Sequence, residues 1–236
     1  MYPPARWADR FFGAAERGVR QLMENRYIVV EGPIGIGKTS LAQLLAERFG
    51  GGAVLEVVEE NPFLTRFYTD RQKYAFQTQL FFLLSRFRQQ QELFQPDLFR
   101  SVVVSDYLFA KDRIFACLNL DAHELALYDR IFEALGPRVA RPDLVIFLQA
   151  RLDVLLQRIR KRGREYERQF DPHYLDKLIR AYNDYFFHYS ETPLLVINTS
   201  DIDFVNDQQD FENLVNVIGK MRVGTHHYIP ISSKRL

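Results

Sequence analysis

The stretch Tyr27-Ile-Val-Val-Glu-Gly-Pro-Ile-Gly-Ile-Gly-Lys-Thr39 decides the fold class of this 236-residue chain. Its first five residues form a short apolar run that ends at a glycine, as a buried parallel strand does. Residues 32–39 match the phosphate-loop pattern G-x-x-x-x-G-K-[ST] at every specified position. Apolar residues at 41, 44, 45 and 49 then recur at helical spacing before Gly50-Gly51-Gly52. A strand, a glycine loop and a helix in this order predict a phosphate-binding βα unit.

The residue types in this loop suit the polyphosphate of a nucleotide. Gly32, Gly35 and Gly37 let backbone N–H groups curve around phosphate oxygens without a clash from Cβ. The N-terminus of the following helix adds positive potential. Lys38 can reach the outer phosphates, and the Thr39 hydroxyl can ligate Mg²⁺. The motif predicts a nucleoside triphosphate with Mg²⁺ but leaves the reaction open, and the alternative is a glycine-rich turn without a ligand.

The rest of the chain repeats the same alternation of strands and helices. Further apolar strands are predicted at 53–58, 101–105, 143–148 and 194–198, with helices at 71–95, 107–118, 122–135, 151–162, 172–189 and 210–222. Short apolar strands alternating with helices predict an α/β fold, a five-stranded parallel sheet with helices on both faces. One domain over 27–222 follows an N-terminal extension, 1–26. The polar tail 223–236 is expected to be mobile or to contact a partner.

Composition excludes several classes of protein. Thirty-one Lys plus Arg against 30 Asp plus Glu give a net charge of +1, which argues against binding to a nucleic acid polymer. No stretch approaches the roughly 18 unbroken apolar residues of a membrane span. The single cysteine, Cys117, and an N-terminus without an apolar signal core predict a cytoplasmic protein in a reducing compartment.

Acidic residues follow two of the predicted strands. Glu59 and Glu60 follow the second strand, and Asp106 follows the third. Ligands of such sheets bind beyond the carboxyl ends of the strands, near the phosphate loop. Glu59 or Glu60 could therefore accept a proton from an attacking hydroxyl, and Asp106 or Glu59 could hold Mg²⁺ directly or through water. Each acid could equally cap the helix that follows it.

The segment 158–168 is strongly basic, with six basic residues and two acids. Arg158 and Arg162 are four residues apart and share one helix face. Arginines on a closing lid can neutralise charge that develops on a transferred phosphoryl group, which predicts an Arg-rich lid. The alternative is an ordinary solvated surface.

The aromatic helix near 71–95 carries two polar residues on one face. Gln79 and Arg86 lie seven residues apart, or two helical turns. Glutamine can pair with a base edge through both its donor and its acceptor, and arginine can donate to purine acceptors. The aromatic residues around them are more often core, so the polar pair is the informative signal.

These motifs together resemble the deoxyribonucleoside kinase family, and its bacterial deoxyguanosine/deoxyadenosine kinase branch in particular. The resemblance covers roughly residues 27–220 and includes the phosphate loop, the turn from Glu59 to Leu64, Tyr68 with Gln79 and Arg86, Ser105-Asp106 and the basic lid. It implies a P-loop kinase fold and transfer of the ATP γ-phosphoryl group to the 5′-hydroxyl of a purine deoxynucleoside. It also implies a homodimer built from helices.

The resemblance assigns roles around the nucleoside. Glu59, rather than Glu60, would take the 5′-hydroxyl proton, and Tyr68 with Glu167 would hold the sugar 3′-hydroxyl. The residues implied at the base are Gln79, Arg86, Asp112 and the stacking ring of Phe115. The donors of Arg86 make guanine the better match, but the choice between deoxyguanosine and deoxyadenosine stays open, as does deoxycytidine as a side substrate.

It also assigns roles around ATP. Arg158, Arg162 and Arg164 would contact the phosphates from the lid, and Asp203-Phe204 would hold the adenine. One departure concerns the segment Asp106-Tyr107-Leu108, where many family members have an arginine directly after the acid. The cation expected near the 5′-oxygen is missing from that position, and Arg113 or a lid arginine is a candidate substitute.

Two other functions fit the phosphate loop. A nucleoside monophosphate kinase would need a cation cluster at the acceptor site, for which Arg66, Arg71 and Lys73 lie close together in sequence. A non-catalytic nucleotide-dependent regulator is the second. A GTPase should carry an Asn-Lys-x-Asp motif, which this sequence lacks.

Overall fold

The computed structural model describes residues 26–93, 102–164, 167 and 171–230, apart from the side chains of Glu59, Glu92 and Leu93. A parallel six-stranded sheet in the order β2-β3-β1-β4-β5-β6 forms its centre. The strands are β1 Arg26–Glu31, β2 Gly52–Val54, β3 Val102–Ser105, β4 Leu144–Gln149, β5 Leu194–Asn198 and β6 Thr225–Tyr228. The predicted extension 1–26 lies outside the described residues except for Arg26, which begins β1.

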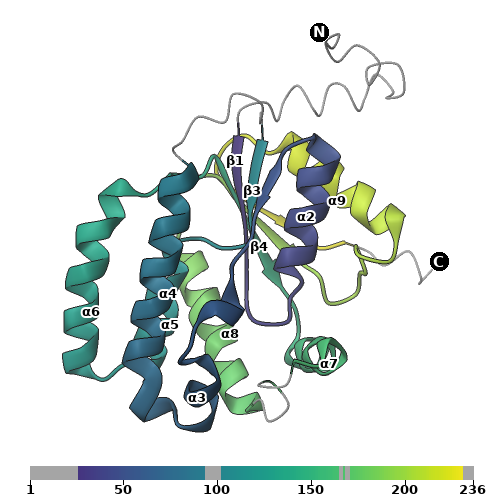
Figure 1. Cartoon of the computed structure of the whole chain (residues 1–236). Helices are drawn as coiled ribbons and strands as arrows, with labels where there is room; N and C mark the ends of the chain where they lie inside the picture. Colours follow the sequence, from purple (N-terminus) through teal and green to yellow (C-terminus); the bar gives the residue numbers. More distant parts are fainter. Residues whose placement is uncertain (1–25, 94–101, 165–166, 168–170, 231–236) are drawn as a thin grey trace, which may run out of the picture.

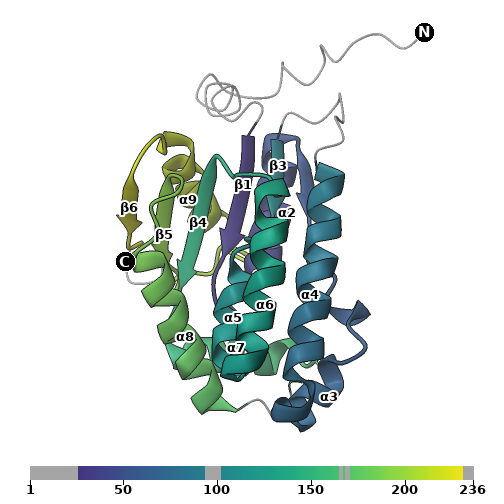
Figure 2. The same cartoon turned by 90° about the vertical axis from the view of Figure 1, so that its left-hand side faces the viewer.

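Helices cover both faces of this sheet, as predicted (Figure 1). One face packs against α2 (Lys38–Phe49) and α9 (Gln208–Lys220). The other carries α4 (Arg71–Leu93), α5 (Lys111–Asn119), α6 (Ala122–Leu135) and α8 (Pro172–Phe187), which stand in front of the strands in Figure 2. The remaining elements are η2 Val58–Glu60, α3 Leu64–Thr69, η3 Gly136–Arg138 and α7 Leu152–Arg162.

The central strands are apolar on both sides because helices cover both. Ile28, Val29 and Val30 of β1 are fully buried, and the residues of β4 from Leu144 to Leu148 are at most 1% exposed. A second, smaller core lies between α4, α5 and α6 around Leu83 and Tyr128. Within the described residues, no helix has the length and apolar character needed to cross a membrane.

The predicted number of strands, five, is wrong, because the sheet has a sixth strand. Thr225–Tyr228 pairs in parallel with Leu194–Ile197 of β5 and forms the sheet edge, within the segment predicted to be a polar tail. The sequence Thr-His-His-Tyr is exposed over most of its length, so it shows no apolar run. An edge strand needs only backbone pairing on one side, which a hydrophobic pattern does not reveal.

Strand β2 is shorter than predicted, and this changes which acidic residue lies at its carboxyl end. It ends at Val54, whereas the apolar pattern predicted a strand to residue 58. Beyond Val54 the chain pairs with the residue after β3: Asp106 N donates to Val54 O at 3.2 Å, and Glu56 N donates to Asp106 Oδ1 at 2.7 Å. The acid nearest to the carboxyl end of β2 is therefore Glu56.

Candidate active site

The phosphate loop connects β1 to α2 at the carboxyl end of the sheet. Gly32 has φ +151°, and a Cβ there would lie 2.6 Å from Leu148 O of the neighbouring strand. Gly35 has φ +82°, and its Cβ would meet Ile159 of α7 at 2.6 Å. Both positions therefore require glycine for backbone conformation and for space. The loop found here has the strand–loop–helix context that its sequence predicts.

Lys38 is the cation of this loop. Its Nζ donates to Gly32 O at 2.8 Å and to Pro33 O at 3.2 Å. Burial, together with the positive charge of Lys111, lowers the pKa of the ammonium to about 8. A lysine held this way is oriented along the loop, where the outer phosphates of a nucleotide would bind.

Thr39 and Asp106 form the oxygen-rich corner of the site. The Thr39 hydroxyl donates to Asp106 Oδ2 at 2.6 Å, while Asp106 Oδ1 accepts from the backbone of Glu56. Asp106 is 3% exposed. A hydroxyl and a carboxylate side by side are the hard oxygen donors that Mg²⁺ prefers, so this pair fits the predicted metal site. No cluster of three or more His, Cys, Asp or Glu side chains suited to a metal occurs in the described part of the chain.

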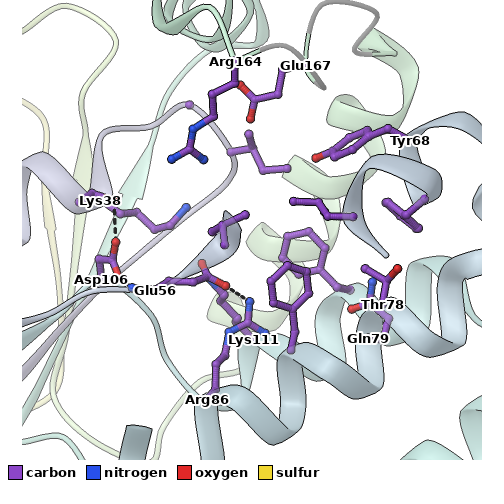
Figure 3. Close-up of a pocket in the computed structure, with 18 of the residues that line it drawn as sticks. Lys38, Glu56, Tyr68, Thr78, Gln79, Arg86, Asp106, Lys111, Arg164 and Glu167 are labelled. Carbon is purple, nitrogen blue, oxygen red and sulfur yellow. Dashed lines mark hydrogen bonds and ion pairs between the residues drawn. The ribbon is translucent and has the colours of Figure 1, made fainter. Parts of the chain in front are cut away.

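A pocket opens beside the phosphate loop and joins most of the predicted residues (Figure 3). Those lining it are Gly35, Lys38, Thr39, Tyr68, Gln79, Arg86, Asp106, Phe115, Arg162, Arg164 and Glu167. Asp112, Arg158, Asp203 and Phe204 do not line it. The pocket is also lined by residues outside the predicted motifs, of which Glu56 and Lys111 are charged.

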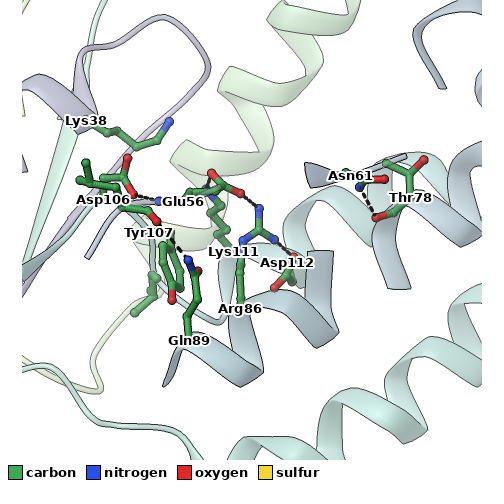
Figure 4. A network of polar contacts seen from close by, with 12 residues as sticks. Lys38, Glu56, Asn61, Thr78, Arg86, Gln89, Asp106, Tyr107, Lys111 and Asp112 are labelled. Carbon is green, nitrogen blue, oxygen red and sulfur yellow. Dashed lines mark hydrogen bonds and ion pairs between the residues drawn. The ribbon is translucent and has the colours of Figure 1, made fainter. Parts of the chain in front are cut away.

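Glu56 sits at the centre of a buried charge network (Figure 4). Its Oε1 pairs with Arg86 of α4, and its Oε2 accepts from Lys111 Nζ of α5 at 2.7 Å. Arg86 also pairs with Asp112, which is fully buried. Burial by itself raises the pKa of the Glu56 carboxyl, but the charges of Arg86 and Lys111 outweigh it, and the pKa falls well below its ordinary value. The carboxylate is therefore ionised at neutral pH and can accept a proton.

The sequence assigned this proton-accepting role to Glu59. Glu59 lies in η2, and its side chain is outside the described residues, while Glu60 is exposed. The predicted second strand, extended to residue 58, put both Glu59 and Glu60 near its carboxyl end, and the family resemblance favoured Glu59. The sequence prediction did not include Glu56, because this residue lies inside that apolar run. The available signal was a charged residue, Glu56, between the apolar pairs Val54-Leu55 and Val57-Val58.

The side of the pocket formed by α4 has a different character. Gln79 is 3% exposed and lines the pocket, and no hydrogen bond joins its amide to another described residue. Thr78 is 1% exposed, and its Oγ1 likewise has no partner among them. Tyr68 of α3 lies across the pocket (Figure 3), and Phe115 packs edge-on against Tyr182. Unpaired amide and hydroxyl groups in an aromatic pocket suit a polar, flat ligand.

The lid residues divide into two groups. Arg162 Nε donates to Glu167 Oε2 at 3.1 Å, and both residues line the pocket with Arg164. Arg158 instead donates to Ile36 O at 3.2 Å and to Thr199 O at 2.9 Å. The guanidinium of Arg158 thus ties the phosphate loop to the segment after β5, outside the pocket.

Asp203 and Phe204 lie on the other side of the phosphate loop. The ring of Phe204 lies close to Gly37, where an added Cβ would be 3.1 Å from it. Phe204 borders a separate hollow between α2 and α9. The backbone N–H of Asp203 donates to Asp210 Oδ2 at 2.9 Å. This segment is adjacent to the phosphate loop but separate from the pocket that holds Glu56.

Comparison with known proteins identifies the family to which this chain belongs. The family model described as deoxynucleoside kinase matches residues 28–223. The chain belongs to the deoxynucleoside kinase family. The kinase is 37% identical to the deoxyguanosine kinase of Bacillus subtilis (strain 168) over 193 residues, which cover 80% of this chain and 93% of that protein. It is 32% identical to the deoxyadenosine/deoxycytidine kinase of the same bacterium over 205 residues, with 84% and 94% covered.

Solved structures agree with this fold. The kinase resembles deoxyadenosine kinase from M. mycoides with bound dATP, with a TM-score of 0.70, 23% sequence identity, and coverage of 83% of this chain and 100% of that one. The predicted α/β phosphate-loop fold and the enzyme class, an ATP-dependent deoxynucleoside kinase, are confirmed.

The structure also locates the candidate substitutes for the missing arginine. Arg113 of the kinase has a side chain that is 53% exposed and pairs with Asp129 of α6 at 3.0 Å, away from the pocket. Tyr107 occupies the position after Asp106 and is fully buried. Arg113 is therefore not the cation beside the acid, and the described cations nearest to Glu56 are Arg86 and Lys111.

The cations that kept a monophosphate acceptor open do not gather in the pocket. Arg66 and Lys73 lie over the ring of Tyr74, at 5.8 Å and 5.5 Å from its centroid. Arg71 lies 4.0 Å from the centroid of Tyr174. In the described part of the chain, Arg66, Arg71 and Lys73 therefore do not form the cation cluster in the pocket that a monophosphate acceptor would require.

Proposed function

We propose that this kinase transfers the γ-phosphoryl group of ATP to the 5′-hydroxyl of a purine deoxynucleoside in nucleotide salvage. The observation that carries the proposal is that one pocket holds the phosphate-loop lysine Lys38, the carboxylate of Glu56 and the amide of Gln79, which pairs with no other described residue (Figure 3). These groups suit the phosphates, the reacting hydroxyl and the base of one substrate pair. The similarity to a deoxyguanosine kinase supports deoxyguanosine as the preferred acceptor.

Glu56 is the base in this proposal. Its carboxylate accepts the 5′-hydroxyl proton, the 5′-oxygen bonds to the γ-phosphorus, and the bond from that phosphorus to the β,γ-bridging oxygen breaks to release ADP. Lys38 stabilises charge on the outer phosphates, and Arg162 and Arg164 do so from the lid. Tyr68 and Glu167 lie across the pocket, where they are suited to the sugar 3′-hydroxyl.

Thr39 and Asp106 would hold the Mg²⁺ that accompanies ATP. The ion supplies charge neutralisation for the phosphates when it is bound. Asp106 would accept the ion with the oxygen that now accepts from Thr39, while its other oxygen keeps the backbone of Glu56 in place. The adenine of ATP would lie toward Asp203 and Phe204, beyond the phosphate loop.

Gln79 is the main base-reading residue of the proposal. Guanine offers an acceptor at O6 and adenine a donor at its 6-amino group, and an amide that turns over can pair with either. Arg86 is less suited to direct reading because Glu56 and Asp112 already pair with its two terminal nitrogens. Its replacement would leave two buried carboxylates together, so it would affect every nucleoside alike.

Replacing Gln79 by leucine is expected to lower kcat/KM for deoxyguanosine by about tenfold or more, since a lost partner of a buried polar group costs on the order of 1–3 kcal/mol. The matched control is Gln77→Leu on the exposed side of the same helix, which should leave kcat/KM unchanged. Steady-state rates with deoxyguanosine, deoxyadenosine, deoxycytidine and thymidine measure the effect. An equal loss in both variants, or none in either, contradicts base reading by Gln79.

An assay with ATP against deoxynucleosides, ribonucleosides and nucleoside monophosphates tests the function itself. ADP release should be fastest with deoxyguanosine or deoxyadenosine and should be negligible with monophosphates. Thymidine as the best acceptor would refute the purine assignment while leaving the family unaffected. Release of ADP only with a monophosphate would refute the proposed reaction.

We further propose a homodimer in the cytoplasm. Leu84 of α4 and Leu127 of α6 are 46% and 50% exposed, and their helices pack together on one side of the molecule (Figure 2). Two such faces from two copies would bury these leucines. Light scattering of the wild type and of Leu84→Glu measures the assembly: a monomeric wild type would contradict the proposal.

A further inference from the structure

Lys111 has an unusual position for a lysine. It is the first residue of α5, it is 3% exposed, and it lines the substrate pocket. Its Nζ lies 2.7 Å from Glu56 Oε2. A lysine is almost never fully buried unless it is paired, so the contact with Glu56 accounts for its charge. Both partners of this ion pair line the pocket, so a ligand bound there could contact them.

The two cations on Glu56 are not equivalent. Arg86 pairs with Glu56 through one end of its guanidinium and with Asp112 through the other, which holds it between two carboxylates. Lys111 forms an ion pair with one carboxylate among the described residues, that of Glu56. An ammonium has three donors, and Lys111 can therefore keep Glu56 while it donates to a substrate oxygen.

The turn before α5 explains why Lys111, and not the residue directly after Asp106, places its charge in the pocket. Ser105 Oγ donates to Tyr107 O at 3.0 Å and accepts from Tyr107 N at 3.3 Å, so the turn is tight. The ring of Tyr107 points into the core beside Arg86 and Lys111, each 6.0 Å from its centroid. The residue after Asp106 thus fills the interior, and Lys111, one turn later, reaches the pocket (Figure 3).

We propose that Lys111 is a catalytic residue that contacts the 5′-oxygen of the nucleoside. This rests on the proposed function, in which Glu56 is the base. Lys111 holds the Glu56 carboxylate with one proton and donates another to the 5′-oxygen. As the 5′-oxygen loses its proton to Glu56 and bonds to the γ-phosphorus, the ammonium stabilises the negative charge on that oxygen and remains protonated throughout. It takes the place of the arginine absent after Asp106.

Two variants separate a contact with the substrate from a structural role. Lys111→Met keeps the length of the side chain and removes its charge, and it should lower kcat by about 10²–10³-fold, the usual effect of losing one such donor. Lys111→Arg restores a cation and should recover at least about tenfold of that loss. Lys177→Met, at an exposed lysine of α8, is the control and should match the wild type. Thermal unfolding shows whether each variant is folded.

Binding of a nucleoside without a 5′-hydroxyl gives a readout that a structural role would not change. Calorimetry compares deoxyguanosine with 2′,5′-dideoxyguanosine. Wild type should bind deoxyguanosine more tightly by about threefold or more, and this preference should disappear in Lys111→Met while remaining in Lys111→Arg. Should Lys111→Met fail to fold, the same comparison between wild type and Lys111→Arg, together with the kcat of Lys111→Arg, still tests the contact.

Three outcomes overturn the proposal. They are a folded Lys111→Met with kcat within about threefold of wild type, a preference for the 5′-hydroxyl that persists in that variant, and a folded Lys111→Arg whose kcat is no higher than that of Lys111→Met. Failure of the base assignment looks different. Glu56→Gln would then keep its kcat, while Lys111→Met would still lose both kcat and the 5′-hydroxyl preference.

Discussion

Replacement of Lys38 by alanine is expected to reduce phosphoryl transfer by about 10³-fold or more, because the variant loses the ammonium that faces the outer phosphates. The fold should survive. The pKa of Lys38 is lowered to about 8 in the folded protein, so the charged ammonium is less favourable there than in the unfolded chain, and its removal relieves that cost. Turnover of ATP with deoxyguanosine and the Tm of the same preparation measure the two effects.

Lys220→Ala is the control for this experiment, since Lys220 is an exposed residue in the last turn of α9. It should retain both turnover and Tm. Turnover near the wild-type rate in a folded Lys38→Ala protein would remove the phosphate loop from the mechanism, and with it the assignment of ATP to this pocket.

Glu56→Gln is expected to lower kcat by about 10²–10⁴-fold with little change in the Kd for deoxyguanosine, since the amide keeps the shape of the side chain but cannot take the 5′-hydroxyl proton. The folded protein should also become less stable. The pKa of Glu56 lies below its ordinary value, so the carboxylate stabilises the fold at neutral pH and loses that contribution as the pH falls. Single-turnover rates and thermal unfolding separate the two effects.

Glu59→Gln and Glu60→Gln are the matched controls, because they remove the two acids that the sequence favoured. A larger loss in Glu59→Gln than in Glu56→Gln would restore Glu59 as the base. Equal rates in wild type and Glu56→Gln would show that Glu56 only balances the charges of Arg86 and Lys111.

Local sequence patterns were sufficient for much of the fold. The phosphate loop, with Lys38 and Thr39, is recognisable because its glycines and its polar residues are consecutive in the chain. The boundaries of α2 and β5 agree with prediction at both ends, since a run of apolar residues between glycines or polar residues is a local signal. The order of these elements was enough for the family resemblance, which the family model confirms.

The parts that were missed depend on partners distant in sequence. Strand β6 shows no apolar pattern, because its pairing with β5 uses backbone groups alone. The early end of β2 depends on Asp106, about 50 residues further along the chain, which accepts from the backbone of Glu56. Because of that contact, Glu56 and not Glu59 is the acid beside Asp106, and we therefore propose Glu56 as the base.

The sequence by itself determined that this chain is a phosphate-loop kinase of the α/β class, because the loop and the alternating elements are encoded in short contiguous segments. Only the tertiary structure decided which acid and which cations lie together in the pocket beside the phosphate loop. Glu56, Arg86 and Lys111 come from three separate elements and meet because burying a carboxylate requires opposite charge within contact distance. That requirement acts in space, so no spacing along the chain could reveal it.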